Sequence, residues 1–379
     1  MESKFISTRK HELDWLRVFA ILVLLFFHTG RIFNVEGWHI KNNEVSGSFD
    51  YWMPFLHSWR MPLLLFISGA GSYFAFKSAG SFLIQRCKRL IIPLIFGMIT
   101  VLPLQFYFEH ITEFSNVWDV YKSFLDYFPF YNGVMNLYHL WFLENLFLYS
   151  LIALPVLIFL HSSYSAAFKT WFMRYFFSPV AVLLVPALLI LATQIILFAN
   201  HPGRAFFVFY LCFFLVGIIF YCNSEYSSSV ARGRKYFLGV SICILIPYIL
   251  YYPFQGFPYL FGRLPIGLAL EIFVGWFWIV TIIAYGQHYL RNPHPLLTTI
   301  GDGIISFYIL HQTVIVVIGY YICQLQWSIA AKFLTINVLT LAFCVAFYLL
   351  CIRPYNVMRI AFGMKLLPAS TSVSSVDTR

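Results

Sequence analysis

Long apolar runs divide most of the chain into ten segments that predict membrane-spanning helices. An α-helix rises 1.5 Å per residue, so about 20 apolar residues cross a hydrocarbon layer of about 30 Å. The fifth and sixth runs are separated only by residues 200–204, a short turn with proline and glycine. The runs lie at residues 13–33, 54–76, 90–109, 139–160, 178–199, 205–222, 236–254, 264–286, 301–322 and 329–352. We therefore expect an all-α, polytopic integral membrane bundle of about ten transmembrane helices.

The amino-acid composition agrees with this expectation and adds that lipid must surround most of the chain. Apolar residues make up 60% of the 379 residues and charged residues only 11%. A soluble domain carries about a quarter charged residues, so no water-soluble fold could hide this much apolar surface. We expect one transmembrane domain at residues 13–352, an N-terminal segment at 1–12 and a tail at 353–379. The Ser/Thr-rich end of that tail predicts disorder.

Lysine and arginine residues predict the orientation, because cytoplasmic loops are enriched in them. With the N-terminus inside, cytoplasmic segments hold 17 of these residues and outer segments hold six. Both termini are therefore expected in the cytoplasm. The same basic loops account for the formal net charge of +10, and no compact basic patch predicts a nucleic-acid partner.

Metal and nucleotide motifs do not occur in the sequence. The seven cysteines show no paired spacing and lie mostly inside apolar runs, which is typical of small packed residues. No HExxH spacing indicates zinc, and no Gly-rich phosphate loop indicates a nucleotide. We expect neither disulfides nor a metal site.

Two ionisable residues in the first run lie on one helical face. Arg17 and His28 are eleven residues apart, which places them about 20° from alignment and about 16 Å apart along the axis. Ionisable side chains inside spans are functional candidates. The alternative is that Arg17 reaches lipid phosphate and His28 is simply a packed polar residue.

Further candidates fall at both ends of the predicted bundle. His57 and Arg60 are neighbours on one face at the outer end of the second helix, where the alternative is an interfacial anchor beside Trp59. Arg86 and Arg89 lie in the predicted loop before the third helix. They either bind anionic lipid as topology signals or clamp the phosphates of a cytoplasmic ligand.

The later helices carry a second set of polar residues. The fourth helix begins with His139 and Trp141, with Glu144 deeper, while Glu271 lies inside the eighth helix and His311 midway in the ninth. For Glu271, pairing with His311 or with Arg60 is as good an explanation as chemistry. Outer histidines and inner arginines would then be joined by a polar path.

At these residues the sequence resembles the membrane-bound acyltransferase-3 family, and within it a subgroup associated with succinylation of periplasmic glucans. The likeness extends from about residue 10 to 350. It is carried by Arg17 with His28, by residues 55–61 and 66–69, by 86–93, by 139–143, by 306–311 and by Trp38-His39.

The resemblance implies an enzyme of the bacterial inner membrane that moves an acyl group from cytoplasmic acyl-CoA to a hydroxyl of an extracytoplasmic glycan. Succinyl-CoA or acetyl-CoA would be the co-substrate, with no bound cofactor. Besides the glycan acceptor, the expected partners are membrane lipids and enzymes of glycan synthesis or export.

The resemblance also implies roles for the candidate residues. Arg17, Arg86 and Arg89 would hold the acyl-CoA phosphates. His28 would act as general base, and an acyl-histidine intermediate is the less favoured route. Arg60 or His57 would stabilise the oxyanion. The residues expected at the acceptor or in support of it are His139, Glu144, Trp141, His311, Glu271 and His39.

Two other classes of protein compete with the enzyme. A transporter or flippase for a glycan or acidic solute would also carry charges near the membrane midplane. Transporters often show two repeated halves with broken helices, and the sequence shows no such repeat. A purely structural or sensory membrane protein leaves the outer histidines unexplained.

Overall fold

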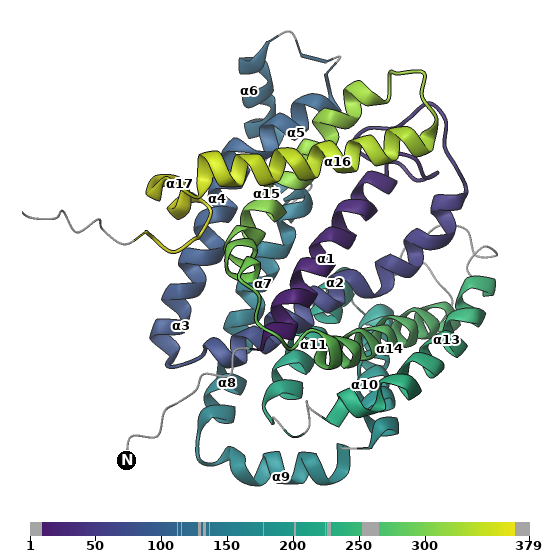
Figure 1. The fold of residues 1–379 in the computed structure, drawn as a ribbon, viewed down its shortest axis with the longest axis vertical. Coiled ribbons are helices and arrows are strands. Elements are labelled where there is room, and N and C mark those ends of the chain that lie inside the picture. The colour runs from purple at the N-terminus through teal and green to yellow at the C-terminus, as the bar shows by residue number, and fades with distance from the viewer. Residues whose placement is uncertain are drawn as a thin grey trace, which may run out of the picture.

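The chain folds into the expected all-α bundle (Figure 1). This computed structural model describes residues 10–367 except 112, 115, 128–129, 132–133, 136, 177, 201, 224, 226–228 and 252–264. The predictions for residues 1–9, for Arg263 and for the end of the tail from 368 lie outside the described residues.

The N-terminal half carries the elements that hold most of the motifs. They are α1 (His11–Gly30), α2 (Ser48–Ala75), α3 (Ala79–Arg86), the π-helix η1 (Cys87–Ile91), α4 (Ile92–Thr100), α5 (Leu102–Glu109), α6 (Val117–Tyr127), the two-residue strands β1 (Phe130–Tyr131) and β2 (Val134–Met135), the 3-10 turn η2 (Tyr138–Leu140), α7 (Trp141–Ile152), α8 (Leu154–His161) and α9 (Ser165–Phe176). The two strands pair antiparallel as a small hairpin.

The C-terminal half consists of longer helices. They are α10 (Pro179–Asn200), α11 (Pro202–Tyr221), the 3-10 turn η3 (Ala231–Gly233), α13 (Arg234–Tyr251), α14 (Pro265–Tyr289), α15 (Leu296–Ile322), α16 (Ile329–Phe347), the π-helix η5 (Tyr348–Ile352) and α17 (Asn356–Ala361). All seven cysteines are free thiols.

Eight helices of the described chain are long and apolar enough to cross a membrane. The number is nine if the pair Tyr138–Ile152 and Leu154–His161, which contains α7 and α8 and is bent by 49°, is counted as one span. These nine match nine of the ten predicted runs. The second run forms α2, which the same hydropathy criterion leaves out. Polar residues such as His57 and Arg60 lower its hydropathy, and it lies in the bundle interior instead, packed by α1, α11 and α14.

Glycines let α2 pack directly against α11. A Cβ atom added at Gly69 would lie 2.0 Å from the Phe214 carbonyl oxygen, and one added at Gly217 would lie 2.1 Å from that of Phe66. Small residues at such crossings allow two membrane helices to approach at backbone distance. Packing of α2 against α11 therefore explains why glycine occupies position 69 in the motif at residues 66–69.

The expected loop before the third span is helical, which corrects the sequence-based prediction. One helical run covers Ala79–Glu109, so Arg86 and Arg89 lie on a helix rather than in a loop. The helix is held there because Arg86 donates to the hydroxyl of Ser72 at 2.6 Å and stacks over Phe82 at 4.8 Å. Helix α2 likewise begins at Ser48, so His57 lies in its third turn rather than at its start.

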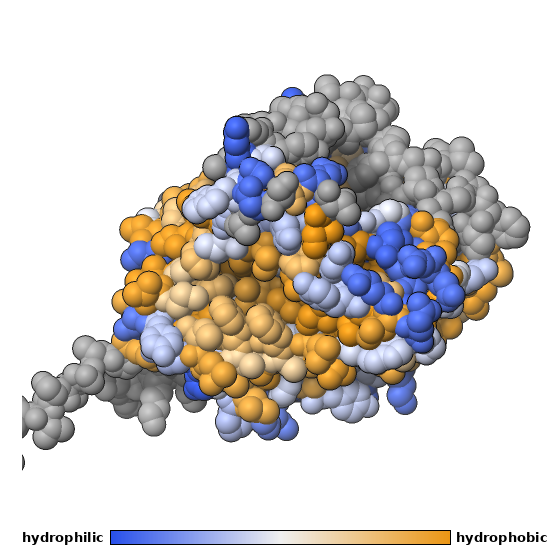
Figure 2. All heavy atoms as spheres, turned by 90° about the horizontal axis from the view of Figure 1, so that it is seen from above, coloured by the Kyte–Doolittle hydropathy of each residue, from blue (hydrophilic) through white to orange (hydrophobic). Residues whose placement is uncertain are grey.

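Apolar side chains cover much of the outer surface. Figure 2 shows apolar residues over large parts of one described face, with hydrophilic residues gathered in patches. Exposed large residues of this kind include Ile196 on α10, Leu250 on α13 and Leu350 on η5, each at least 63% exposed. Such a surface suits lipid rather than water. The protein is a multi-pass membrane protein.

Candidate active site

Three histidines from three different helical elements meet near the end of α1. The ring of His28 lies 5.3 Å from the ring of His311 on α15. The ring of His139, on η2, lies 5.5 Å from that of His311. We call His28, His139 and His311 the imidazole cluster. His28 belongs to the first predicted run and His311 to the ninth, so the fold brings together two side chains that are 283 positions apart in the chain.

Backbone contacts hold the two later histidines in place. His139 Nε2 lies 3.0 Å from the carbonyl oxygen of Ile309, and His311 Nδ1 lies 2.7 Å from that of Tyr308. The hydroxyl of Tyr308 donates to the carbonyl oxygen of His139. His311 is fully buried. The rings are thus positioned by η2 and α15 independently of α1.

The imidazole cluster keeps nitrogen atoms free for a ligand. Buried Nδ1 of His28, Nδ1 of His139 and Nε2 of His311 have no hydrogen-bond partner among the described residues. Buried polar atoms normally find partners, so three such atoms in one cluster indicate a functional site. Within the described part of the chain, no group of three or more His, Cys, Asp or Glu side chains is arranged to hold a metal ion.

A buried arginine lies beside the imidazole cluster. The guanidinium of Arg60 stacks on Phe27, with Cζ 3.5 Å from the ring centroid, and its Nη2 lies 3.3 Å from Nδ1 of His57. The Phe27 ring meets the His28 ring edge to face at 5.7 Å. Arg60 is only 5% exposed. Because a guanidinium stays protonated, it supplies a fixed positive charge next to His28.

The segment after α1, residues 31–47, covers the same region, and we call it the outer loop. Trp38 stacks against His28 with ring centroids 6.0 Å apart. Lys41 ties the loop to itself by donating to the carbonyl oxygens of Arg31, at 2.8 Å, and of Asn34. Partial burial lowers the pKa of Lys41 to about 8, so the amine is still protonated at neutral pH.

His39, which follows Trp38 in the outer loop, is the centre of a polar network. Its Nδ1 lies 3.0 Å from Oε2 of Glu109, and its Nε2 lies 3.2 Å from the Gln105 amide nitrogen and 3.0 Å from that of Gln312. These partners place the proton on Nδ1, where it is donated to the carboxylate. Glu109 was missed from the sequence, although it is the acidic residue that ends the third apolar run.

The backbone is strained where the network meets η2. Tyr138 has φ of 46°, the single positive value at a non-glycine residue in the described chain. A bulky side chain rarely adopts this conformation, and such strain gathers at functional sites. Tyr138 directly precedes His139 in the chain, and its ring lies 5.2 Å from the ring of His39.

The structure places the other three predicted supporting residues on α7 and α14. Trp141 packs against Phe206 and Tyr210 with ring centroids 5.3 and 5.2 Å away. Glu144 is half-buried on α7. Glu271 is buried on α14, and together with Arg60 it acts electrostatically on Tyr210.

The opposite end of α1 opens onto a cavity of about 190 Å³, which we call the inner cavity. It brings together Arg17, Arg86 and Arg89, the three arginines predicted to act as one group. Arg17 lies 3.4 Å from Asp14, one turn away on the same helix. The other lining residues include the polar Ser68 and Asp302 and the apolar Ile21 and Ile305.

The inner cavity ends next to the imidazole cluster. Tyr308 lines the cavity, and its ring lies 5.8 Å from that of His139 and 5.8 Å from that of His311. His28 itself does not line the cavity, so the path from Arg17 to His28 stays a prediction beyond Tyr308.

The family is decided by comparison with known sequences. The acyltransferase domain family matches residues 10–351. The chain belongs to this family, and it is therefore a multi-pass membrane acyltransferase. The match runs from α1 into η5 and includes the imidazole cluster and every residue that lines the inner cavity except Gly363 and Met364.

Among curated proteins, the chain is similar to the glucans biosynthesis protein C of Salmonella paratyphi B, of Salmonella dublin and of Salmonella enteritidis. Each is 22% identical over 343 residues, which cover 83% of this chain and 85% of the relative. No solved structure matches the chain significantly. The predicted family is confirmed, and the predicted likeness to glucans biosynthesis protein C is found as well.

Proposed function

We propose that the protein transfers an acyl group, succinyl or acetyl, from cytoplasmic acyl-CoA to a hydroxyl of a periplasmic glucan or related glycan in the bacterial inner membrane. One observation carries the proposal. The cavity that is lined by three arginines is also lined by Tyr308, whose ring contacts the imidazole cluster. The relatives' name supplies the glucan.

The arginines suit the donor. Acyl-CoA carries its phosphates at one end and its thioester at the other, so the protein needs cations separated from the reacting groups. Arg17, Arg86 and Arg89 supply these cations, and guanidinium groups bind phosphate oxygens with two parallel hydrogen bonds. The thin pantetheine arm then lies along the more apolar part of the inner cavity toward Tyr308.

His28 serves as the general base in this proposal. Its imidazole takes the proton from the glycan hydroxyl as the oxygen attacks the thioester carbonyl carbon. The new C–O bond forms, the C–S bond breaks, and the CoA thiolate leaves and receives the proton. His28 suits this role because its buried Nδ1 has no hydrogen-bond partner among the described residues.

Arg60 stabilises the charge that develops in the reaction. The tetrahedral intermediate places a negative charge on the former carbonyl oxygen, and a preorganised cation in a dry site stabilises it strongly. Arg60 is buried, stacked on Phe27 and beside His57, so its position is fixed before the substrate binds. It also suits the second carboxylate of a succinyl group.

The outer loop forms the acceptor side. Trp38 offers an aromatic face next to His28, and aromatic faces stack on sugar rings. The pair of His39 and Glu109 holds the loop across α5 and fixes Trp38 in place. A transporter would need neither a general base nor a loop anchored over it, so the family assignment and this geometry together favour transfer over transport.

The proposal is tested with purified protein in nanodiscs. Succinyl-CoA or acetyl-CoA is added with glucan oligosaccharides, and free CoA thiol and acylated product are measured together. We expect both to appear with the wild-type protein and neither to appear with His28→Ala. Product formed at the wild-type rate by His28→Ala would contradict the assigned base, and no product from either CoA ester would contradict the donor.

A further inference from the structure

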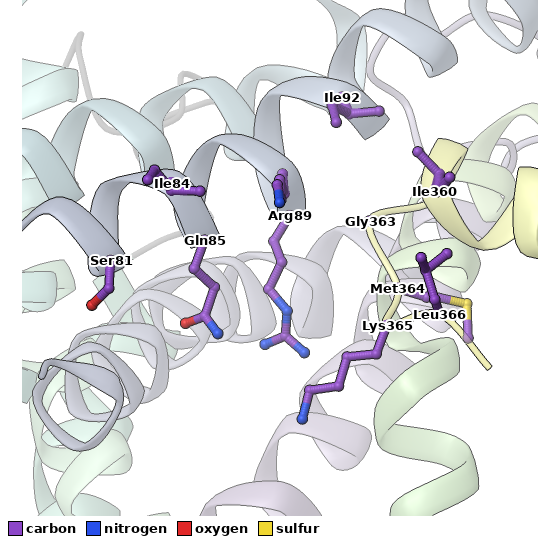
Figure 3. Close-up of a pocket in the computed structure, with 11 residues that line it drawn as sticks. Ser81, Ile84, Gln85, Arg89, Ile92, Ile360, Gly363, Met364, Lys365 and Leu366 are labelled. Atoms are coloured by element: carbon purple, nitrogen blue, oxygen red, sulfur yellow. The ribbon is translucent and has the colours of Figure 1, made fainter. Parts of the chain in front are cut away.

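A second, larger cavity opens beside the inner cavity, and the proposed function does not yet use it. Its volume is about 760 Å³, within the range of small-molecule sites. It lies between the helical run α3–η1–α4 and the segment that follows α17 (Figure 3). Its polar wall consists of Gln85, Lys88, Arg89 and Lys365. We call this cavity the basic vestibule.

The basic vestibule and the inner cavity share one wall. Gln85, Arg89, Gly363 and Met364 line both. A ligand can therefore occupy the wide space with one part and the narrow one with another. Figure 3 shows Gln85 and Arg89 extending from the helix, and Lys365 from the opposite segment, into the same space. Arg89 lies at the junction of the two.

The segment after α17 is held firmly as the opposite wall. Arg359 is buried, and it donates from Nε to the carbonyl oxygen of Lys365 at 2.6 Å and from Nη1 to that of Arg353 at 3.0 Å. Phe362 packs edge to face on Phe96 of α4 at 5.2 Å. This part of the predicted tail thus belongs to the folded bundle.

A glycine brings this wall close to the helix. Gly363 has φ of +66°, and an added Cβ would lie 2.7 Å from Pro93 and 2.8 Å from the carbonyl oxygen of Arg89. Both the positive φ and the close approach require glycine. The contact fixes Lys365, two residues later, opposite Arg89.

The cations of the basic vestibule are not neutralised by the protein. Within the described residues, no ion pair joins a carboxylate to Lys88, Arg89 or Lys365. Lys88 and Lys365 are exposed at the rim. Three cations from two segments around one space form a site for a multiply charged anion. Apolar side chains on the same walls, among them Ile84 and Ile360, offer a surface against which a flat ring can pack.

The helix itself is altered at this place. Lys88 and Arg89 lie in η1, a π-helical turn inside an otherwise α-helical run. Such turns change the direction in which side chains leave the helix and are frequent at functional sites. Here Arg89 lines both cavities, while Lys88 lines only the basic vestibule.

We propose that the basic vestibule binds the 3′-phosphorylated adenosine end of CoA, with Lys88 and Lys365 on the 3′-phosphate and Arg89 on the pyrophosphate at the junction. This inference rests on the proposed function, because the pantetheine arm then continues into the inner cavity. A phosphate monoester is the feature recognised. An anionic lipid headgroup offers similar chemistry, so the test distinguishes the two sources.

The test compares CoA with 3′-dephospho-CoA, which lacks only the terminal phosphate. Binding of each to the full-length protein in neutral-lipid nanodiscs is measured by calorimetry. We expect the wild type to prefer CoA by about tenfold, the effect of one strong charged hydrogen bond. Lys365→Gln should lose this preference and Lys365→Arg should keep it. Lys235→Gln, which removes an exposed lysine of α13 outside both cavities, is the matched control and should keep it too.

The outcomes separate this inference from the proposed function. If the wild type binds both compounds equally, or if Lys365→Gln keeps the preference for CoA, the assignment of the vestibule is wrong while the acyl-CoA donor stands. If the wild type binds neither compound, the donor itself is wrong. If Lys365→Gln instead loses only co-purifying anionic lipid, the occupant is a lipid headgroup and the inference is overturned.

Discussion

The two ends of α1 differ in how their polar groups are held. At the His28 end, the imidazole cluster, Arg60 and the network of His39 are buried or half-buried, and aromatic rings, backbone carbonyls and side-chain hydrogen bonds hold them. At the Arg17 end, the cations surround two cavities, and several are exposed. The first end is mostly enclosed by protein, and the second opens onto two cavities and carries several cations.

This difference separates the transfer step, at the His28 end, from the binding of the anionic donor, at the Arg17 end. Groups that stabilise a transition state act best when they are preorganised and shielded from water. Groups that collect a large anion from solution act through charge and access. Substitutions at the His28 end should therefore lower the rate of transfer, and substitutions at the Arg17 end should raise the concentration of donor that is needed.

The largest effect is expected for His28→Ala. Loss of a general base lowers the rate by about 10²–10⁴-fold, so acylated product should fall below detection while the protein remains in the membrane. His110→Ala is the control, because His110 follows the last residue of α5 and its side chain, among the described residues, hydrogen-bonds only to the carbonyl oxygen of Phe106. Equal loss of activity in the control would mean that histidine removal acts through folding.

The second-largest loss of rate is expected for substitution of Arg60. Removing a preorganised cation from an oxyanion site costs about 10²–10³-fold in kcat, so we expect that loss for Arg60→Ala in single-turnover assays. Arg60→Lys keeps the charge but loses the planar stacking on Phe27, and it should recover only part of the rate. Full activity of the alanine variant would remove Arg60 from the mechanism.

A smaller effect is expected where the outer loop is anchored. Glu109→Gln weakens the contact with His39, which is a positioning contact, so kcat should fall by about tenfold. His39→Gln should cause a similar loss, and the double variant should be no worse than either single one, because the two side chains act as a unit. Additive losses would show that they act independently.

At the open end, Arg17→Ala should change binding rather than rate. One phosphate contact is worth about tenfold in affinity, so the KM for acyl-CoA should rise by that factor with kcat nearly unchanged. The measurement is initial rate against acyl-CoA concentration. An unchanged KM would remove Arg17 from the donor site, and a fall in kcat alone would place it with the chemistry.

The sequence predicted what depends on helical spacing. Arg17 and His28 follow from the period of one helix, and His57 with Arg60 from a single turn of another. The spans were found because lipid imposes length and apolarity on each helix. The exception is α2, whose polar residues are tolerated because protein, not lipid, surrounds it.

The rest depends on contacts that local spacing does not encode. Gln312 bonds to His39 across 273 positions of the chain, and Glu109 reaches the same side chain only because α5 packs beside the outer loop. Lys365 seemed to belong to a tail, because nothing local shows that Arg359 and Gly363 fix that segment against α4. The roles predicted for Glu144 and Glu271 stay predictions.

The central claim is that this protein acylates a glycan through His28. The most direct measurement is mass spectrometry of periplasmic and surface glycans from cells that lack the protein, carry the wild type or carry His28→Ala at equal abundance. Glycans that gain the mass of a succinyl or acetyl group only with the wild type are the predicted result. Identical glycan masses in all three strains would contradict the account.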